Sequence, residues 1–161
     1  MVVKLDGSVW ATGWNEYGQL GDGSTTDKMS FVQVVSSGAK TVAAGSRHSI
    51  MLKEDGSVWA TGYNLYGQLG DGTTIDCKVF KQIIAGDVKS VAAGAFHSMA
   101  IKQDDSIWAS GSNKHGQFGV GSTKSENVFF RITPFDKGAA HIMTIRVSCF
   151  SICFTSPKRT L

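Results

Sequence analysis

Proline, cysteine and long apolar runs are scarce in this sequence. Only 2 of its 161 residues are proline, against 19 glycines, a balance that favours tight turns over extended proline-rich linkers. No segment approaches the roughly 20 apolar residues that a membrane-spanning helix needs, and the first residues contain no apolar run of signal-peptide length. We therefore expect a soluble protein inside the cell, in the cytoplasm or the nucleus, with no membrane contact.

The three cysteines, Cys77, Cys149 and Cys153, are an odd and scattered set. Such a set argues against a disulfide scaffold and is typical of a reducing compartment. Cys149 and Cys153 have neither a histidine nor a second cysteine pair close by, so we expect no metal site.

Charge of one sign is in small excess, with a formal net charge of +3. The excess lies at the end of the chain, where residues 106–161 carry seven Lys or Arg against two Asp or Glu. A basic cluster of this density is more typical of solvated surface than of a nucleic-acid site, so we do not expect nucleic acid as a partner.

The sequence does contain a repeat with a period of 49 residues. Residues 6–23 read DGSVWATGWNEYGQLGDG, residues 55–72 read DGSVWATGYNLYGQLGDG, and residues 104–121 read DDSIWASGSNKHGQFGVG. Residues 6–45 and 55–94 are identical at 25 of 40 positions without a gap. One active site needs one set of residues, whereas stacked copies of a structural unit recur in this way.

Each unit predicts about four short strands. Asp-Gly between two apolar runs is a strong hairpin signal, so Ser49–Lys53 and Ser57–Thr61 are predicted to pair as antiparallel strands. Apolar runs such as Phe80–Ile84 and Ser90–Ala93 predict two further strands. The glycines of residues 15–26 would break a helix and favour sharp turns and close backbone approach between units. Four strands in a glycine-punctuated repeat indicate a blade of a β-propeller.

The motif DGSVWATGxNxYGQLGDG, followed by VAAGxxHS, resembles the repeat of the regulator of chromosome condensation family over about residues 1–130. That family forms seven-bladed propellers that mostly serve as protein-binding platforms, and some members are guanine-nucleotide exchange factors for a small GTPase. The resemblance implies an all-β fold, here a partial, open β-propeller of about three four-stranded blades from a seven-bladed ring. Seven units would need about twice this length, so we expect a fragment.

The predicted propeller repeats cover residues 1–136, in units of about 1–49, 50–98 and 99–136. Residues 137–161 are interpreted as a degenerate or truncated fourth repeat with a basic tail, or as the product of a disturbed gene boundary. Within them, residues 147–152 resemble VAAG…HSI with three residues missing at the turn, so strands are expected there with a different turn.

His48 and His97 are the residues that suggest catalysis, because each is followed by a serine, Ser49 or Ser98. Neighbouring residues of a strand point to opposite faces, so neither serine suits the histidine beside it as a nucleophile. We expect structural histidines that bond to the backbone in each blade. A lone aspartate per loop does not make a calcium site. We therefore expect no catalytic residue, no metal, no cofactor and no enzyme activity.

Two positions differ in all three copies of the nearly invariant loop, and they are the candidate partner-binding residues. They are Trp14, Tyr63 and Ser112 at the first position and Glu16, Leu65 and Lys114 at the second. Framework positions are held by the fold, so variable ones are free to contact a partner, and Trp, Tyr and Leu suit a protein interface better than a solvated loop. Neutral drift on a surface loop is the alternative interpretation.

The sequence thus favours a non-catalytic protein–protein interaction module whose partner is unknown. The alternative is a guanine-nucleotide exchange factor, or a fragment of one, with a small GTPase as partner; a hydrolase using His48 or His97 is a third hypothesis. In a propeller each blade covers the apolar face of the next. We therefore expect self-association through the open blade edges, or a partner that supplies further blades.

Overall fold

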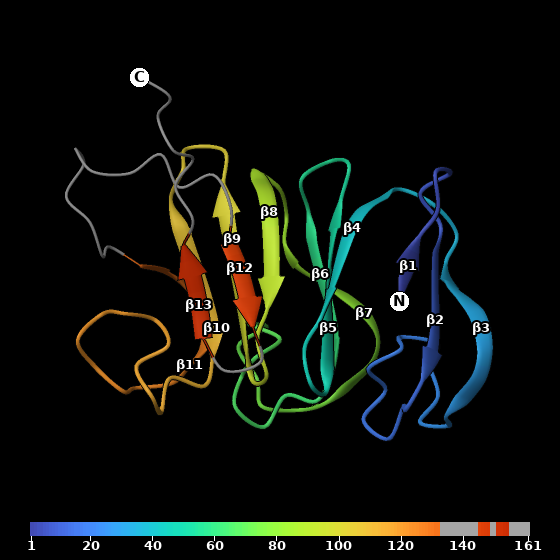
Figure 1. Cartoon of the computed structure of the whole chain (residues 1–161), viewed down its shortest axis with the longest axis horizontal. Coiled ribbons are helices and arrows are strands. Elements are labelled where there is room, and N and C mark those ends of the chain that lie inside the picture. The colour runs from blue at the N-terminus through green and yellow to red at the C-terminus, as the bar shows by residue number, and fades with distance from the viewer. Residues whose placement is uncertain (133–144, 149–150, 155–161) are drawn as a thin grey trace.

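The computed structural model describes residues 1–132 in full, together with the backbone of Ile145–Ser148 and Ser151–Phe154 (Figure 1). Strands and turns make up the described residues, which include no helix that could cross a membrane. The prediction of an all-β, open, partial propeller is confirmed.

The strands group into three blades and a terminal pair. Blade 1 contains β1 (Val2–Val3), β2 (Val9–Gly13) and β3 (Lys28–Val35). Blade 2 contains β4 (Ala39–Ala44), β5 (His48–Lys53), β6 (Val58–Gly62) and β7 (Cys77–Ile84). Blade 3 contains β8 (Val88–Ala93), β9 (His97–Lys102), β10 (Ile107–Gly111) and β11 (Glu126–Ile132). The pair is β12 (Ile145–Ser148) and β13 (Ser151–Phe154).

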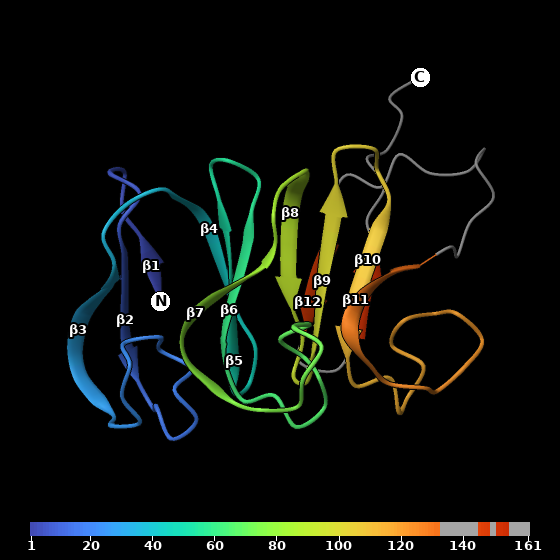
Figure 2. The same ribbon diagram turned by 180° about the vertical axis from the view of Figure 1, so that it is seen from behind.

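The blades stand side by side in chain order, and each is an antiparallel meander (Figure 1). The predicted Asp-Gly hairpin is confirmed, because β5 pairs with β6 in the register Met51 to Trp59. The outer strands β3, β7 and β11 follow one another along the side of the molecule that Figure 2 brings forward. Blade 1 has three strands where blades 2 and 3 have four.

The predicted tail, residues 137–161, lies largely outside the described residues. The strands expected near residues 147–152 are present as β12 and β13, which pair antiparallel in the register Val147 to Ile152. β12 lies beside β8 of blade 3.

The hydrophobic core lies between the blades. Val9, Ala39 and Met51 are buried at the junction of blades 1 and 2, and Ile50, Val58, Val88 and Ala100 are among those buried at the junction of blades 2 and 3. This arrangement follows from the alternation of side chains along a strand, because Val9 and Ala11 of β2 are buried whereas Trp10 and Thr12 are half-buried.

The repeated tryptophans close the edges of these junctions. Trp59 is half-buried and packs against the cluster of Val9, Ala39 and Met51. Its Nε1 donates a hydrogen bond to Ser57 Oγ at 2.9 Å, and Lys53 Nζ lies 4.3 Å from its ring centroid. Trp59 is therefore a packing residue, and Trp10 and Trp108 at the equivalent positions are half-buried as well.

The glycine-rich connections of blades 1 and 2 each touch the outer strand of the next blade. A Cβ added to Gly21 would lie 2.7 Å from the Phe80 ring, and one added to Gly70 would lie 2.5 Å from the Phe129 ring. The Gly72 amide donates a hydrogen bond to the Asn127 carbonyl at 2.8 Å. The expectation that these glycines allow close approach between neighbouring units is confirmed.

Candidate functional site

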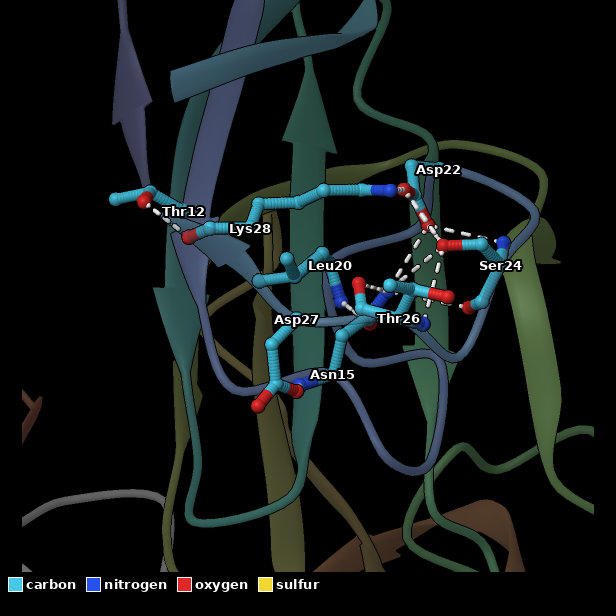
Figure 3. Close-up of polar contacts among 8 residues, drawn as sticks. All are labelled: Thr12, Asn15, Leu20, Asp22, Ser24, Thr26, Asp27 and Lys28. Carbon is cyan, nitrogen blue, oxygen red and sulfur yellow. Dashed lines mark hydrogen bonds and ion pairs between the residues drawn. The ribbon is translucent and has the colours of Figure 1, made fainter. Parts of the chain in front are cut away.

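The three glycine-rich connections lie together at one end of the blades, the lower end in Figure 1, opposite the Asp-Gly hairpin turns. In each connection a buried asparagine holds the loop. Asn15 is 0% exposed; its Oδ1 accepts a hydrogen bond from the Leu20 amide, and its Nδ2 donates to Asp22 Oδ1 and to the Thr26 carbonyl (Figure 3). Asn64 repeats these contacts in blade 2. The loops are therefore preformed platforms.

Asp22 stabilises the same loop as a carboxylate. Burial alone would raise its pKa, but the hydrogen bonds from the Ser24 amide, Lys28 Nζ, the Ser24 hydroxyl and Asn15 Nδ2 outweigh burial and lower the pKa to about 2. Lys28 Nζ lies 3.0 Å from Asp22 Oδ2 (Figure 3). Asp22 Oδ1 accepts a hydrogen bond from the Ser24 amide of its own turn, and among the described residues no cluster of metal-ligating side chains exists.

The predicted partner-binding residues differ in how exposed they are to solvent. Trp14 is 45% exposed and Leu65 is 58% exposed. Glu16 and Lys114 are also exposed, and Tyr63 is half-buried.

The prediction that Ser112 contacts a partner is corrected, because Ser112 is only 5% exposed and does not belong to the accessible surface. Its amide donates a hydrogen bond to the Phe96 carbonyl at 2.7 Å. Tyr63 makes the equivalent bond to the Arg47 carbonyl at 2.9 Å and is half-buried, so this bond alone does not explain why Ser112 is buried. The variation between copies at this position is therefore not by itself a sign of exposure.

Aromatic side chains form a continuous row across the three blades, which we call the aromatic face. Its members are Trp14, Tyr17, Tyr63, Tyr66 and Phe96. The ring centroids of Trp14 and Tyr17 are 5.5 Å apart, those of Tyr17 and Tyr63 are 4.8 Å apart, and those of Tyr66 and Phe96 are 5.3 Å apart. Most of these pairs meet edge to face, the geometry that aromatic pairs prefer.

Arg47 lies among three of these rings. Its guanidinium carbon is 5.6 Å from the Trp14 centroid, 5.1 Å from that of Tyr17 and 5.7 Å from that of Tyr63. Its Nη1 donates a hydrogen bond to the Tyr17 hydroxyl at 3.3 Å. Arg47 makes no ion pair with any carboxylate of residues 1–132. A half-buried guanidinium with free donors suits an incoming carboxylate.

Sequence reasoning missed Tyr17, Tyr66, Arg47 and Phe96 as members of this face. Tyr17 and Tyr66 are identical in the first two copies and His115 takes their place in the third, so this position varies less than the two that were singled out. Arg47 and Phe96 occupy the same position of the Gly-x-x-His turn and differ between copies. The criterion that singled out Trp14 and Tyr63 would have found them.

The histidines have a structural environment that differs from the one predicted. His48 Nε2 lies 2.9 Å from the Ser98 hydroxyl of the next blade, and that hydroxyl donates its one hydrogen to the Gln68 carbonyl at 2.7 Å. His48 is therefore the donor to Ser98, and the predicted bond to the backbone is wrong. Ser98 lies on β9 of blade 3, so its hydroxyl reaches the His48 ring across the junction of blades 2 and 3.

A serine nucleophile requires a histidine that accepts the serine proton, whereas His48 donates its own proton to Ser98. Burial, with a smaller contribution from His97, lowers the pKa of His48 to about 3. Burial also lowers the pKa of His97. Both rings are neutral near pH 7.

The fold and the repeat were compared with known proteins. A family model described as the regulator of chromosome condensation (RCC1) repeat matches residues 6–52 and 55–101. A second model with the same description matches residues 39–68 and 88–117. A comparison with curated proteins gives no significant match.

Solved structures resemble the chain in fold. One is Prp20p from Saccharomyces cerevisiae, described together with its binding to Gsp1p and histones; it is 23% identical, with a TM-score of 0.70 and 81% of this chain covered. Another is yeast RCC1 (Prp20) bound to Kap60, which is 21% identical, with a TM-score of 0.73 and the same coverage. The chain spans about a third of each relative, 35% and 34% of their lengths. With its repeats matched over more than half of its length, this chain belongs to the regulator of chromosome condensation repeat family.

Proposed function

We propose that the chain is a non-catalytic protein-binding module whose partner docks on the aromatic face and on Leu65. The observation that carries the proposal is Arg47, which has no ion pair among residues 1–132 and is held between Trp14, Tyr17 and Tyr63. Aromatic residues and arginine dominate the binding energy of protein interfaces. Trp14 and Leu65 add exposed apolar area on the same loops.

The rigidity of the loops supports the same proposal. The buried Asn15 and Asn64 fix each connection through hydrogen bonds to several backbone groups. A surface that is already ordered loses little conformational entropy when a partner binds. The partner we expect offers a carboxylate for Arg47 beside apolar side chains for Trp14 and Leu65.

The experiment is selection of peptides from a displayed random library on the immobilised chain. Arg47→Glu and Trp14→Ala should each weaken the selected peptides by roughly tenfold or more, the size of a hot-spot loss. Ile75→Ala is the matched control, because Ile75 is 73% exposed near the end of the blade 2 connection and is not a member of the aromatic face. Peptides that bind all three variants as well as the original chain would refute this site.

Guanine-nucleotide exchange on a small GTPase is the alternative function, and the fold shared with Prp20p, which is described with its binding to Gsp1p, favours it. Release of a fluorescent guanine nucleotide from a Ran-type GTPase distinguishes the two functions. Under our proposal the chain does not accelerate release. Acceleration that is lost in Arg47→Glu would replace the binding module by an exchange factor acting through the same face.

We also place the protein inside the cell, in the cytoplasm or the nucleus. The odd, scattered cysteines support this placement, and Cys77 is a free thiol. A fluorescent fusion of the chain viewed in living cells tests it.

A further inference from the structure

The contact between neighbouring blades has the same two parts at both junctions in the chain. One part is the glycine-rich connection, which we call the socket; the other is the outer strand of the next blade with its phenylalanine, which we call the plug. At the junction of blades 2 and 3 the Phe129 ring lies on Gly70, and the Gly72 amide bonds to the Asn127 carbonyl at 2.8 Å. At the junction of blades 1 and 2 the Phe80 ring lies on Gly21.

The socket of blade 3 has no plug among the described residues. Added Cβ atoms at Gly116, Gly119 and Gly121 would meet no described atom within 4 Å, although these glycines have the same positive φ as their counterparts. Beside them Val120, which stands where the other sockets have aspartate, is 37% exposed. The socket therefore keeps its shape while presenting an apolar surface.

Blade 1 has the converse feature, a plug without a socket. Phe31 lies 49 residues before Phe80 and 98 residues before Phe129, so it occupies the plug position of β3. Its side chain is 52% exposed, and Met29 beside it is 95% exposed. The equivalent phenylalanines of β7 and β11 are half-buried against their sockets.

We propose that a second copy of this chain fills the socket of blade 3, with β3 of one copy docked on residues 116–121 of the other. By the register of the two internal junctions, the Gly121 amide would bond to the Met29 carbonyl of the second copy and the Phe31 ring would lie on Gly119. The interface joins two different surfaces, so it is heterologous and continues into rings or longer chains. The partner is a second copy because its β3 carries the same phenylalanine at the same repeat position as the two plugs that are seated.

Complementation between two variants tests this pairing by sedimentation velocity. Phe31→Asp removes the plug and leaves the socket. Gly119→Asn blocks the socket, because a side chain there occupies the place of the ring, and asparagine accepts the positive φ of +68 at this position. Ile75→Asp is the control for an added charge at an exposed apolar residue.

The original chain and Ile75→Asp should sediment as dimers and larger species. Each blocking variant alone should weaken association by roughly tenfold or more, and an equimolar mixture of the two should restore a dimer, because one good plug then meets one good socket. Monomers of 17.2 kDa for the original chain would overturn the proposal. Undiminished association of the blocking variants, or a mixture that stays monomeric while both variants remain folded by circular dichroism, would overturn it as well.

Discussion

His48 of blade 2 donates a hydrogen bond to the hydroxyl of Ser98 in blade 3, at 2.9 Å and fully buried. The Ser98 hydroxyl in turn donates a hydrogen bond to the Gln68 carbonyl, in the loop that carries Tyr66 and Leu65. The bond therefore connects the packing of two blades to the loops of the aromatic face. His48, which resembled a catalytic residue in the sequence, therefore links two neighbouring repeats.

The first prediction concerns this bond. His48→Ala and Ser98→Ala should each lower the free energy of unfolding, since each leaves a buried polar group without its partner. The double variant should lose less than the sum of the two, by a coupling of about 1 kcal/mol. Urea denaturation of the four proteins measures it. Strict additivity would show that the two side chains do not interact.

The second prediction concerns pH. Burial lowers the pKa of His48 from 6.5 to about 3, so below pH 6.5 the unfolded chain binds a proton that the folded chain does not. The free energy of unfolding should therefore fall as pH drops below 6.5, by up to about 1.4 kcal/mol per pH unit for this histidine. His97 acts in the same direction.

Urea midpoints between pH 7.5 and pH 5 isolate this effect, because the carboxylates titrate at lower pH. His48→Gln should flatten the dependence. A slope that is the same with and without His48 would mean that the ring is protonated in the folded protein.

The third prediction concerns the glycine of the Gly-x-x-His turn. A Cβ added to Gly45 would lie 2.5 Å from both His48 Nδ1 and the Gly94 carbonyl oxygen, so Gly45→Ala should destabilise the fold by about 1–3 kcal/mol through overpacking. Gly86→Ala is the control, since its Cβ would meet nothing closer than 3.8 Å. Thermal melts compare the two. Equal melting temperatures would contradict the packing of the ring on Gly45.

The strands were predictable from the sequence because their signals are local. Asp-Gly turns and alternating apolar residues specify a hairpin without reference to the rest of the chain, and β5 and β6 form within one residue of the predicted bounds. The same signals recur in each of the three copies of the repeat. The glycine sockets were predictable in kind, because glycines at this density require sharp turns or close approach.

The partners of those residues were not predictable, because they depend on how the blades stack. Nothing in one unit indicates that His48 meets Ser98, or that Arg47 lies between rings from two loops. Ser112 was misjudged for the same reason, since its exposure depends on the residues packed around it in the fold, which leave it only 5% exposed. The role of Asn15 could have been inferred, because asparagine recurs at this position in all three copies and can hold a loop through its amide.

The fourth prediction compares the socket of blade 2, which holds Phe129, with the socket of blade 3, which has no plug among the described residues. Gly70 and Gly119 have φ values of +75 and +68, so alanine costs about 1–2 kcal/mol in backbone strain at either position. Only Gly70→Ala adds a clash, because its Cβ would lie 2.5 Å from the Phe129 ring, whereas the same atom at Gly119 meets no described atom within 4 Å. Overpacking costs typically about 1–3 kcal/mol. Urea denaturation at a protein concentration that keeps the chain monomeric should therefore give Gly70→Ala a free energy of unfolding about 1–3 kcal/mol lower than that of Gly119→Ala. If both variants lose the same free energy of unfolding, backbone conformation alone requires glycine at these positions, and the Phe129 ring does not lie on Gly70 as described.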